Sequence, residues 1–181
     1  LLEDHRGRMW LATHGHGLGW FEADHVRFIS AADGLPARFV TSLHEAADGT
    51  LWAATLGLGL YRLKDGTWTQ IDRRHGLPAE DIYHIADDRR GHLWFTSSIG
   101  VFAVEERELD ACADGQATGL HPLILDRDDG LPSNYCSSGT QSAACMTEDG
   151  RFIVPTTRGV AIVPTRFIRS EAHRVTVRFT G

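Results

Sequence analysis

A unit of 42 residues is copied along this chain, and this repeat limits the possible folds more than any other feature. Tryptophan recurs at this spacing, at Trp10, Trp52 and Trp94. The tripeptide Gly-Leu-Pro keeps the same spacing between Gly34 and Gly76, and it returns a third time at Gly130. A fixed period of this size indicates a solenoid, a propeller or an array of one supersecondary unit.

The internal pattern of the unit decides between these architectures. In residues 37–78, segments 40–45 and 50–55 flank a turn at Asp48-Gly49, and segments 60–63 and 67–71 flank a second turn at Asp65-Gly66. Their β-branched and aromatic residues, and the period-2 alternation of 67–71, are typical of strands joined in hairpins. No window shows apolar residues at helical spacing over several turns. We therefore expect an all-β fold, a partial β-propeller of about four blades, each a four-stranded antiparallel sheet.

Taking Gly-Leu-Pro as the end of a blade divides the chain into units. The predicted blades are residues 1–36, 37–78, 79–132 and 133–165, and an exit segment follows at 166–181, with a strand expected at 174–179. This segment is predicted to begin a following domain or to close the ring. Because the chain starts within a unit, we interpret it as a fragment of a longer propeller.

Two units depart from the pattern. The third is longer than the others, and its extra residues near 110–119 are small and polar, which predicts a loop extension between outer strands. The fourth has Phe152 where tryptophan is expected, and we interpret it as a terminal blade.

Composition argues against several partners. The formal charge is −6 and the basic residues are scattered singly, so no basic stripe is present for nucleic acid. No apolar run approaches the roughly 18 residues of a membrane span, so the chain itself is not expected to contact a membrane, and nothing in it reads as a targeting segment. Its three cysteines allow either a disulfide between Cys136 and Cys145 or small buried thiols.

Three motifs taken together resemble a known repeat. In the second unit they are Asp48-Gly49-Thr50-Leu51-Trp52-Ala53-Ala54-Thr55, Gly57-Leu58-Gly59-Leu60 and Gly76-Leu77-Pro78. This combination resembles the two-component regulator propeller repeat. The stretch from Asp129 to Val160 looks like the last blade of that family, which usually leads into an immunoglobulin-like Y_Y_Y domain.

The resemblance implies sensing rather than catalysis. In this family the propeller is the extracytoplasmic, periplasmic part of membrane receptors, and it feeds histidine kinases, hybrid two-component systems or GGDEF diguanylate cyclases. The expected role is therefore that of a non-catalytic propeller which senses a small-molecule or glycan ligand. We expect no cofactor.

The repeated residues are expected to form the scaffold. Tryptophan at one position of every blade could stack on sugars or bases, but its regular recurrence favours packing in the core. Each Gly-Leu-Pro is predicted to form a corner between blades, in which glycine permits positive φ, leucine fills the gap between sheets and proline fixes the start of the next strand.

Ligand-binding residues are expected where the copies differ, on inner strands and at one mouth of the channel. Counting from each Gly-Leu-Pro aligns Thr41 with Tyr83, Ser42 with His84 and Ser138, and His44 with Ala86. Val40, Ile82 and Cys136 share an apolar position. The candidates are Ser42, His44, Tyr83, His84 and Ser138. The alternative is that they are satisfied polar residues lining a wet channel.

Metal and catalytic motifs are weak. His14-Gly15-His16 invites a metal interpretation, but the aligned residues in the next unit are leucines. The run 126–130 has acidic residues but lacks the later glutamate of a calcium loop, so it is predicted to be a solvated turn. No catalytic motif is present, and the similarity of Leu93-Trp94-Phe95-Thr96 to streptogramin lyase-like propellers leaves a lyase as a minor alternative.

A second function class also fits the repeat. The propeller could serve as a protein-interaction or dimerisation scaffold without a small-molecule site. About four blades leave two sheet faces uncovered unless the ring closes, and exposed apolar faces tend to find partners. We therefore expect self-association through exposed blade faces.

Overall fold

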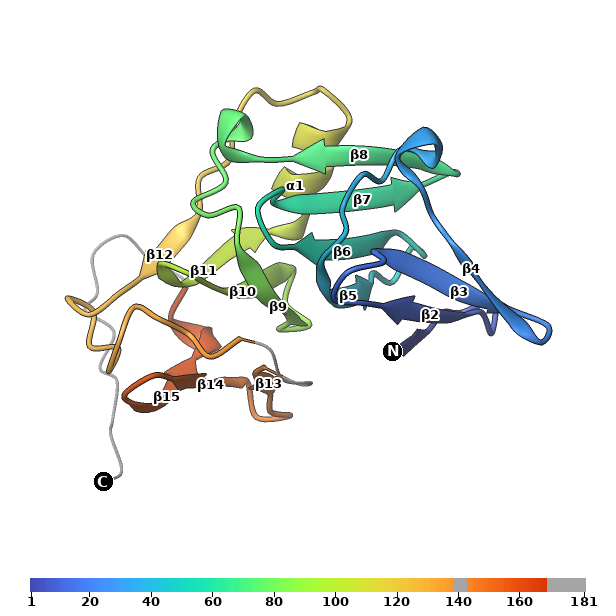
Figure 1. Cartoon of the computed structure of the whole chain (residues 1–181). Helices are drawn as coiled ribbons and strands as arrows, with labels where there is room; N and C mark the ends of the chain where they lie inside the picture. Colours follow the sequence, from blue (N-terminus) through green and yellow to red (C-terminus); the bar gives the residue numbers. More distant parts are fainter. Residues whose placement is uncertain (139–142, 169–181) are drawn as a thin grey trace.

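In the computed structural model, four antiparallel sheets follow one another in chain order along an arc (Figure 1). The structure describes residues 1–138 and 143–168. The expected strand at 174–179 lies outside the described residues. The partial β-propeller predicted from the repeat is confirmed.

Each of the first three sheets has four strands. The first comprises β1 (Leu2–Glu3), β2 (Met9–Ala12), β3 (Leu18–Glu22) and β4 (His25–Phe28). The second comprises β5 (Val40–Glu45), β6 (Leu51–Thr55), β7 (Leu60–Lys64) and β8 (Thr67–Ile71). The third comprises β9 (Ile82–Asp87), β10 (His92–Ser97), β11 (Gly100–Glu105) and β12 (Leu123–Leu125).

The fourth sheet has three strands within the described residues, in the order β13 (Cys145–Met146), β14 (Arg151–Thr156) and β15 (Gly159–Pro164). Short 3-10 turns follow blades one and two, at η1 (Ala31–Asp33) and η2 (Arg73–His75), and a third, η3 (Thr165–Ile168), follows β15. The strands thus keep the sequence repeat, with one hairpin after another in each blade.

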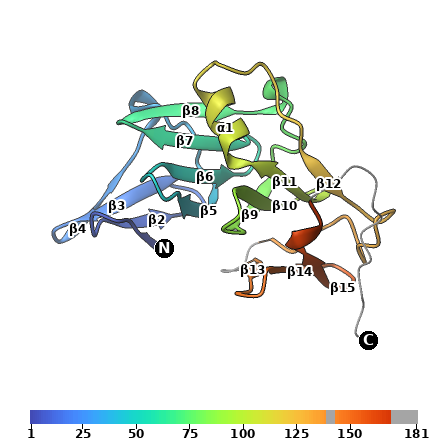
Figure 2. The same cartoon turned by 180° about the vertical axis from the view of Figure 1, so that it is seen from behind.

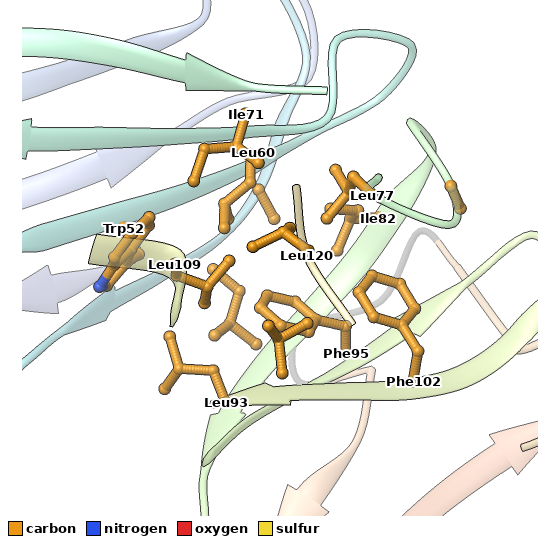
Figure 3. Close-up of a cluster of buried hydrophobic side chains, with 14 of the residues drawn as sticks. Trp52, Leu60, Ile71, Leu77, Ile82, Leu93, Phe95, Phe102, Leu109 and Leu120 are labelled. Carbon is orange, nitrogen blue, oxygen red and sulfur yellow. The ribbon is translucent and has the colours of Figure 1, made fainter. Parts of the chain in front are cut away.

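The hydrophobic core lies between blades rather than inside any one of them. One cluster joins blades one and two, a second joins blades two and three, and a third joins blades three and four. Figure 3 shows the second cluster, in which Trp52, Leu77 and Phe95 converge from different elements. Because each blade buries its apolar face only against its neighbours, adjacent blades stabilise one another.

The repeated tryptophans are buried as predicted. Trp10 belongs to the first cluster, Trp52 to the second and Trp94 to the third, so each contributes to the junction with the next blade. Phe152 of the fourth blade is also buried and lies 5.9 Å from Trp94 between ring centroids. Core packing of this aromatic position is therefore confirmed.

The Gly-Leu-Pro corners also have the predicted structure. The three glycines have φ of 99° at Gly34, 85° at Gly76 and 101° at Gly130, which is the left-handed region that favours glycine. The leucines that follow are buried, and each belongs to a different inter-blade cluster. They are Leu35, Leu77 and Leu131.

The expected extension between outer strands of the third unit is present between β11 and β12, but its first part is a helix rather than a loop. Helix α1 (Glu106–Ala113) begins directly after β11 and lies against β8 and β11, and Figure 2 shows it from the side opposite to Figure 1. Its Leu109 and Cys112 are buried in the second cluster. Two turns of helix are too short to give a repeated helical pattern, and so the sequence did not reveal them.

Ion pairs of one buried arginine also hold α1 in place. Arg62 of β7 is buried, and its guanidinium donates to Asp110 Oδ1 at 2.9 Å and to Asp114. Burial opposes the charge of Arg62, but the hydrogen bonds that the guanidinium donates to the two carboxylates outweigh this effect and raise its pKa. The insertion in blade three is thus fastened to blade two.

The three cysteines are unpaired in the structure, so the alternative of a Cys136–Cys145 disulfide is not supported. Cys112 and Cys136 are buried as expected of small thiols, and burial raises the pKa of Cys136 to about 11. Cys145 is exposed, contrary to the expectation of three buried thiols.

One repeated hydrogen bond is missing from blade two. The indole of Trp10 donates to Asp4 Oδ2 at 2.9 Å, and the indole of Trp94 donates to Asp88 Oδ2 at 3.2 Å. Six residues before Trp52 the chain has Ala46 instead, and the buried Nε1 of Trp52 has no partner among the described residues. A buried donor without an acceptor costs free energy.

Replacing Ala46 by aspartate is expected to raise the free energy of unfolding by about 1 kcal/mol, because the new carboxylate can accept from Trp52 Nε1. The backbone turn is already the one that Asp4 occupies, since Gly49 N–H donates to the Ala46 carbonyl as Gly7 N–H does to Asp4. Urea unfolding measures the change. The exposed neighbour Ala47→Asp is the control, and an Ala46→Asp variant less stable than the parent would contradict the prediction.

Candidate functional site

The candidate residues lie on the first strands of blades two and three. Strands β5 and β9 run side by side near the centre of the arc in Figure 1. Both have an irregular register near their start, between Val40 and Ser42 in β5 and opposite Thr96 and Ser97 in β9. These irregularities turn the polar side chains that follow toward the neighbouring blade.

The structure brings Ser42 and His84 together. Ser42 Oγ accepts a hydrogen bond from the Ile85 N–H at 3.1 Å and lies 3.5 Å from Nδ1 of His84. The adjacent Thr41 hydroxyl donates to the Ile82 carbonyl at 2.7 Å. Ser42 and Thr41 therefore join β5 to β9, and Ser42 has a structural role whether or not a ligand binds.

Both candidate histidines are held toward their neutral form. Burial lowers the pKa of His84 to about 4. Burial also lowers the pKa of His44, although the charges of Asp87 and Glu45 partly oppose it. The Nε2 atom of His44 is buried and has no hydrogen-bond partner among the described residues. A neutral imidazole in this position can donate or accept one further hydrogen bond.

Tyr83 and Ser138 have different surroundings from this pair. Tyr83 is half-buried and packs against the cluster between blades three and four. Burial, and then the charge of Asp81, raise the pKa of its phenol. Ser138 is exposed and precedes the residues that the structure leaves undescribed. The five candidates therefore do not form one compact cluster in the described part of the chain.

The residues considered for metal binding have other neighbours. The ring of His14 lies 5.0 Å from that of Phe39, and the ring of His16 lies 5.6 Å from that of Phe28. Within residues 1–138 and 143–168, no group of three or more acidic, histidine or cysteine side chains has the arrangement of a metal site. In the run 126–130, Asp126 and Asp129 accept backbone hydrogen bonds within their own turn.

The sequence did not predict hollows between blades. A first hollow, of about 280 Å³, lies between blades one and two, and several of its polar groups contact one another: His5 Nδ1 lies 2.5 Å from Glu45, and Lys64 lies 3.1 Å from Asp48. The second, of about 520 Å³, lies between blades three and four and has Arg127 among its lining residues. A comparison of the residues around each Gly-Leu-Pro corner in the sequence would have indicated the second hollow.

The fold and its inter-blade core define the chain as part of a β-propeller. Residues 34–57 and 76–98 match the sequence model of the two-component regulator propeller. Two segments of the chain are therefore similar to this repeat. No curated protein matches the chain in sequence.

Several solved structures share the fold. The extracellular domain of BT3049 from B. thetaiotaomicron, described as a hybrid two component system, matches with a TM-score of 0.69 and 19% identity over 98% of this chain and 25% of its own. That of BT4673 from the same organism matches with a TM-score of 0.72 and 19% identity over 90% of this chain and 23% of its own. The chain thus spans about a quarter of the length of these two domains.

A gluconolactonase from Xanthomonas campestris, XC5397, also shares the fold. It matches with a TM-score of 0.58 and 17% identity over 90% of this chain and 57% of its own. At these identities the likenesses establish the architecture, and function needs separate evidence. Among the described residues, no helix is long and apolar enough to cross a membrane.

Proposed function

We propose that this chain is part of an extracytoplasmic, periplasmic propeller that senses a ligand without catalysis, in a two-component or diguanylate-cyclase receptor. The repeat family supports the receptor class, and two of the structures with the same fold are described as extracellular domains of such systems. The ligand proposed is a small molecule or a glycan.

The observation that carries the proposal is the buried, unpartnered Nε2 of His44. It lies on β5, two residues after Ser42, which contacts His84 of β9. Buried polar atoms normally have hydrogen-bond partners, and an exception is a candidate contact for a bound molecule. The scaffold positions repeat while these inner-strand positions differ between copies, which is the pattern of a binding site built on a constant frame.

A thermal-shift screen of this chain tests the site, with neutral sugars, oligosaccharides and amino acids as probes. A probe that binds is expected to raise the melting temperature of the parent and of His25→Gln, whose side chain is exposed on β4, but not of His44→Gln or His84→Gln. If the melting temperature still rises in both His44→Gln and His84→Gln, these histidines do not contact the probe and the proposed site is wrong.

A scaffold role is the second candidate, because apolar side chains are exposed on the two end blades. Phe21 and Phe28 of the first sheet and Val160 of the fourth are each at least 41% exposed. We propose that such faces pair two copies of the chain. Light scattering tests this: a discrete dimer supports the scaffold, and a monomer of 20.0 kDa contradicts self-association.

A further inference from the structure

The groove between blades three and four has a composition unlike that of the other blade junctions. It lies between the third Gly-Leu-Pro corner, which follows β12 in Figure 1, and the turn that joins β14 to β15. The hollow measures about 520 Å³. The lining residues that matter are Arg127, Ser133, Asn134, Tyr135, Thr157 and Arg158.

This groove is positively charged within an acidic chain. The chain carries a formal charge of −6, yet two arginines and no carboxylate line the groove. Neither guanidinium has an ion pair or a hydrogen bond with any described residue. Of the two carboxylates next to Arg127 in sequence, that of Asp126 is engaged in its own turn, where Oδ1 accepts from the Asp128 N–H at 2.7 Å.

Comparison with the preceding corner shows how the charge arises. Arg73 stands three residues before Gly76 and Glu80 four residues after it, and these two side chains pair at 4.0 Å. The equivalent residues around Gly130 are Arg127 and Asn134. The arginine is thus kept while its carboxylate partner is replaced by a neutral amide, which leaves the positive charge uncompensated.

The β14–β15 turn adds the second cation. The hydroxyl of Thr156 donates to the Gly159 carbonyl at 2.8 Å, as Ser97 does to Gly100 in blade three at 2.9 Å. These bonds align the two turns, and Arg158 occupies the position of Ile99. Blade four therefore presents a guanidinium where blade three has an apolar side chain.

The other polar residues of the groove are held in place by hydrogen bonds, and they offer a hydrogen-bond donor and an aromatic ring to a ligand. The Arg127 N–H donates to Asn134 Oδ1 at 2.8 Å, which holds the side-chain amide and leaves its NH₂ group to donate elsewhere. The Tyr135 carbonyl accepts from the Thr157 N–H at 3.1 Å, and the Tyr135 N–H donates to Ser133 Oγ at 3.1 Å. The backbone of Tyr135 is thus fixed, yet the residue is 66% exposed.

We propose that this groove binds a small hydroxylated carboxylate with a ring, that is, a sugar acid. A guanidinium group recognises a carboxylate through two parallel hydrogen bonds. The Asn134 amide donates to a ligand hydroxyl, and the Tyr135 ring covers one face of the sugar. This binding site is separate from the candidate site at Ser42, His44 and His84 and does not depend on it. Only the consequence of binding, a sensory signal, rests on the function proposed above.

Isothermal titration of the chain at low ionic strength tests the ligand class, with D-glucuronate as the probe and D-glucose and inorganic phosphate as comparisons. Glucuronate is expected to bind at least about tenfold more tightly than either comparison, because hydrogen bonds to charged groups and ring contacts act together. Equal binding of glucose would overturn the role of the arginines. Equal binding of phosphate would overturn the sugar-acid class.

Variants taken from the repeat itself test the location. Asn134→Glu supplies Arg127 with the carboxylate that Glu80 supplies to Arg73, so the fold should be kept while glucuronate affinity falls at least about tenfold. Arg158→Gln should reduce affinity similarly. Arg73→Gln, at the preceding corner, is the matched control and should change nothing. If Asn134→Glu and Arg158→Gln both bind like the parent, the proposal is wrong.

The glucuronate test can be distinguished from the test of the candidate site on β5 and β9. His44→Gln and His84→Gln should leave glucuronate affinity unchanged, because neither residue lines this groove. If those variants lose glucuronate binding while Arg158→Gln keeps it, the proposed groove site is wrong and the ligand binds near His44 and His84 instead. Loss of glucuronate binding in Arg158→Gln, but not in the two histidine variants, supports the groove site whatever the thermal-shift screen finds.

Discussion

Replacing Trp52 by alanine is expected to lower the free energy of unfolding by about 3 to 5 kcal/mol. The indole is 0% exposed and packs in the cluster between blades two and three (Figure 3). Its removal leaves a cavity in the core where blades two and three pack against each other. A loss of this size is a large share of the stability of a typical domain.

Urea unfolding followed by circular dichroism measures this loss, because fluorescence would itself change with the tryptophan. Tyr135→Ala is a suitable control, since that residue is largely exposed and the change should cost less than about 0.5 kcal/mol. A Trp52→Ala variant that melts within about a degree or two of the parent would show that the aromatic is not core, and a surface role would then be needed.

Acidification from pH 7 to 4.5 is expected to destabilise the fold through His84, by up to about 2 kcal/mol. Burial lowers the pKa of His84 to about 4 in the folded chain, while the unfolded histidine titrates near 6.5. Between these values the unfolded chain binds more protons than the folded chain, so falling pH favours unfolding. The stabilisation is complete at neutral pH, and His44, whose pKa burial also lowers, acts in the same direction.

The pH dependence is checked by measuring unfolding at several pH values for the parent and for His84→Gln. The variant should lose much of the slope between pH 6.5 and 4.5, whereas His25→Gln, whose side chain is 71% exposed, should keep it. An unchanged slope in His84→Gln would mean that water reaches this histidine in the folded state.

The sequence predicted most of the scaffold because the scaffold repeats. Trp52 and Leu77 each have counterparts in other units, and every copy is buried at a junction between blades. Helix α1 escaped prediction because it occurs once and spans only Glu106–Ala113. The residues of the candidate site were partly foreseen, since Ser42 and His84 were chosen as variable inner-strand positions, but their contact was not.

The sequence by itself determined the repeat unit, the strand pattern and the aromatic and leucine positions of the core, because local alternation and period depend only on the order of residues. The tertiary structure alone decided which side chains meet across a junction. The Ser42–His84 contact and the ion pair of Arg62 with Asp110 join residues 42 and 48 positions apart, at distances set by the way neighbouring blades pack. The low pKa of His84 and the unpaired arginines of the last groove follow from that packing, because desolvation and the loss of an ion-pair partner depend on what surrounds a group in space.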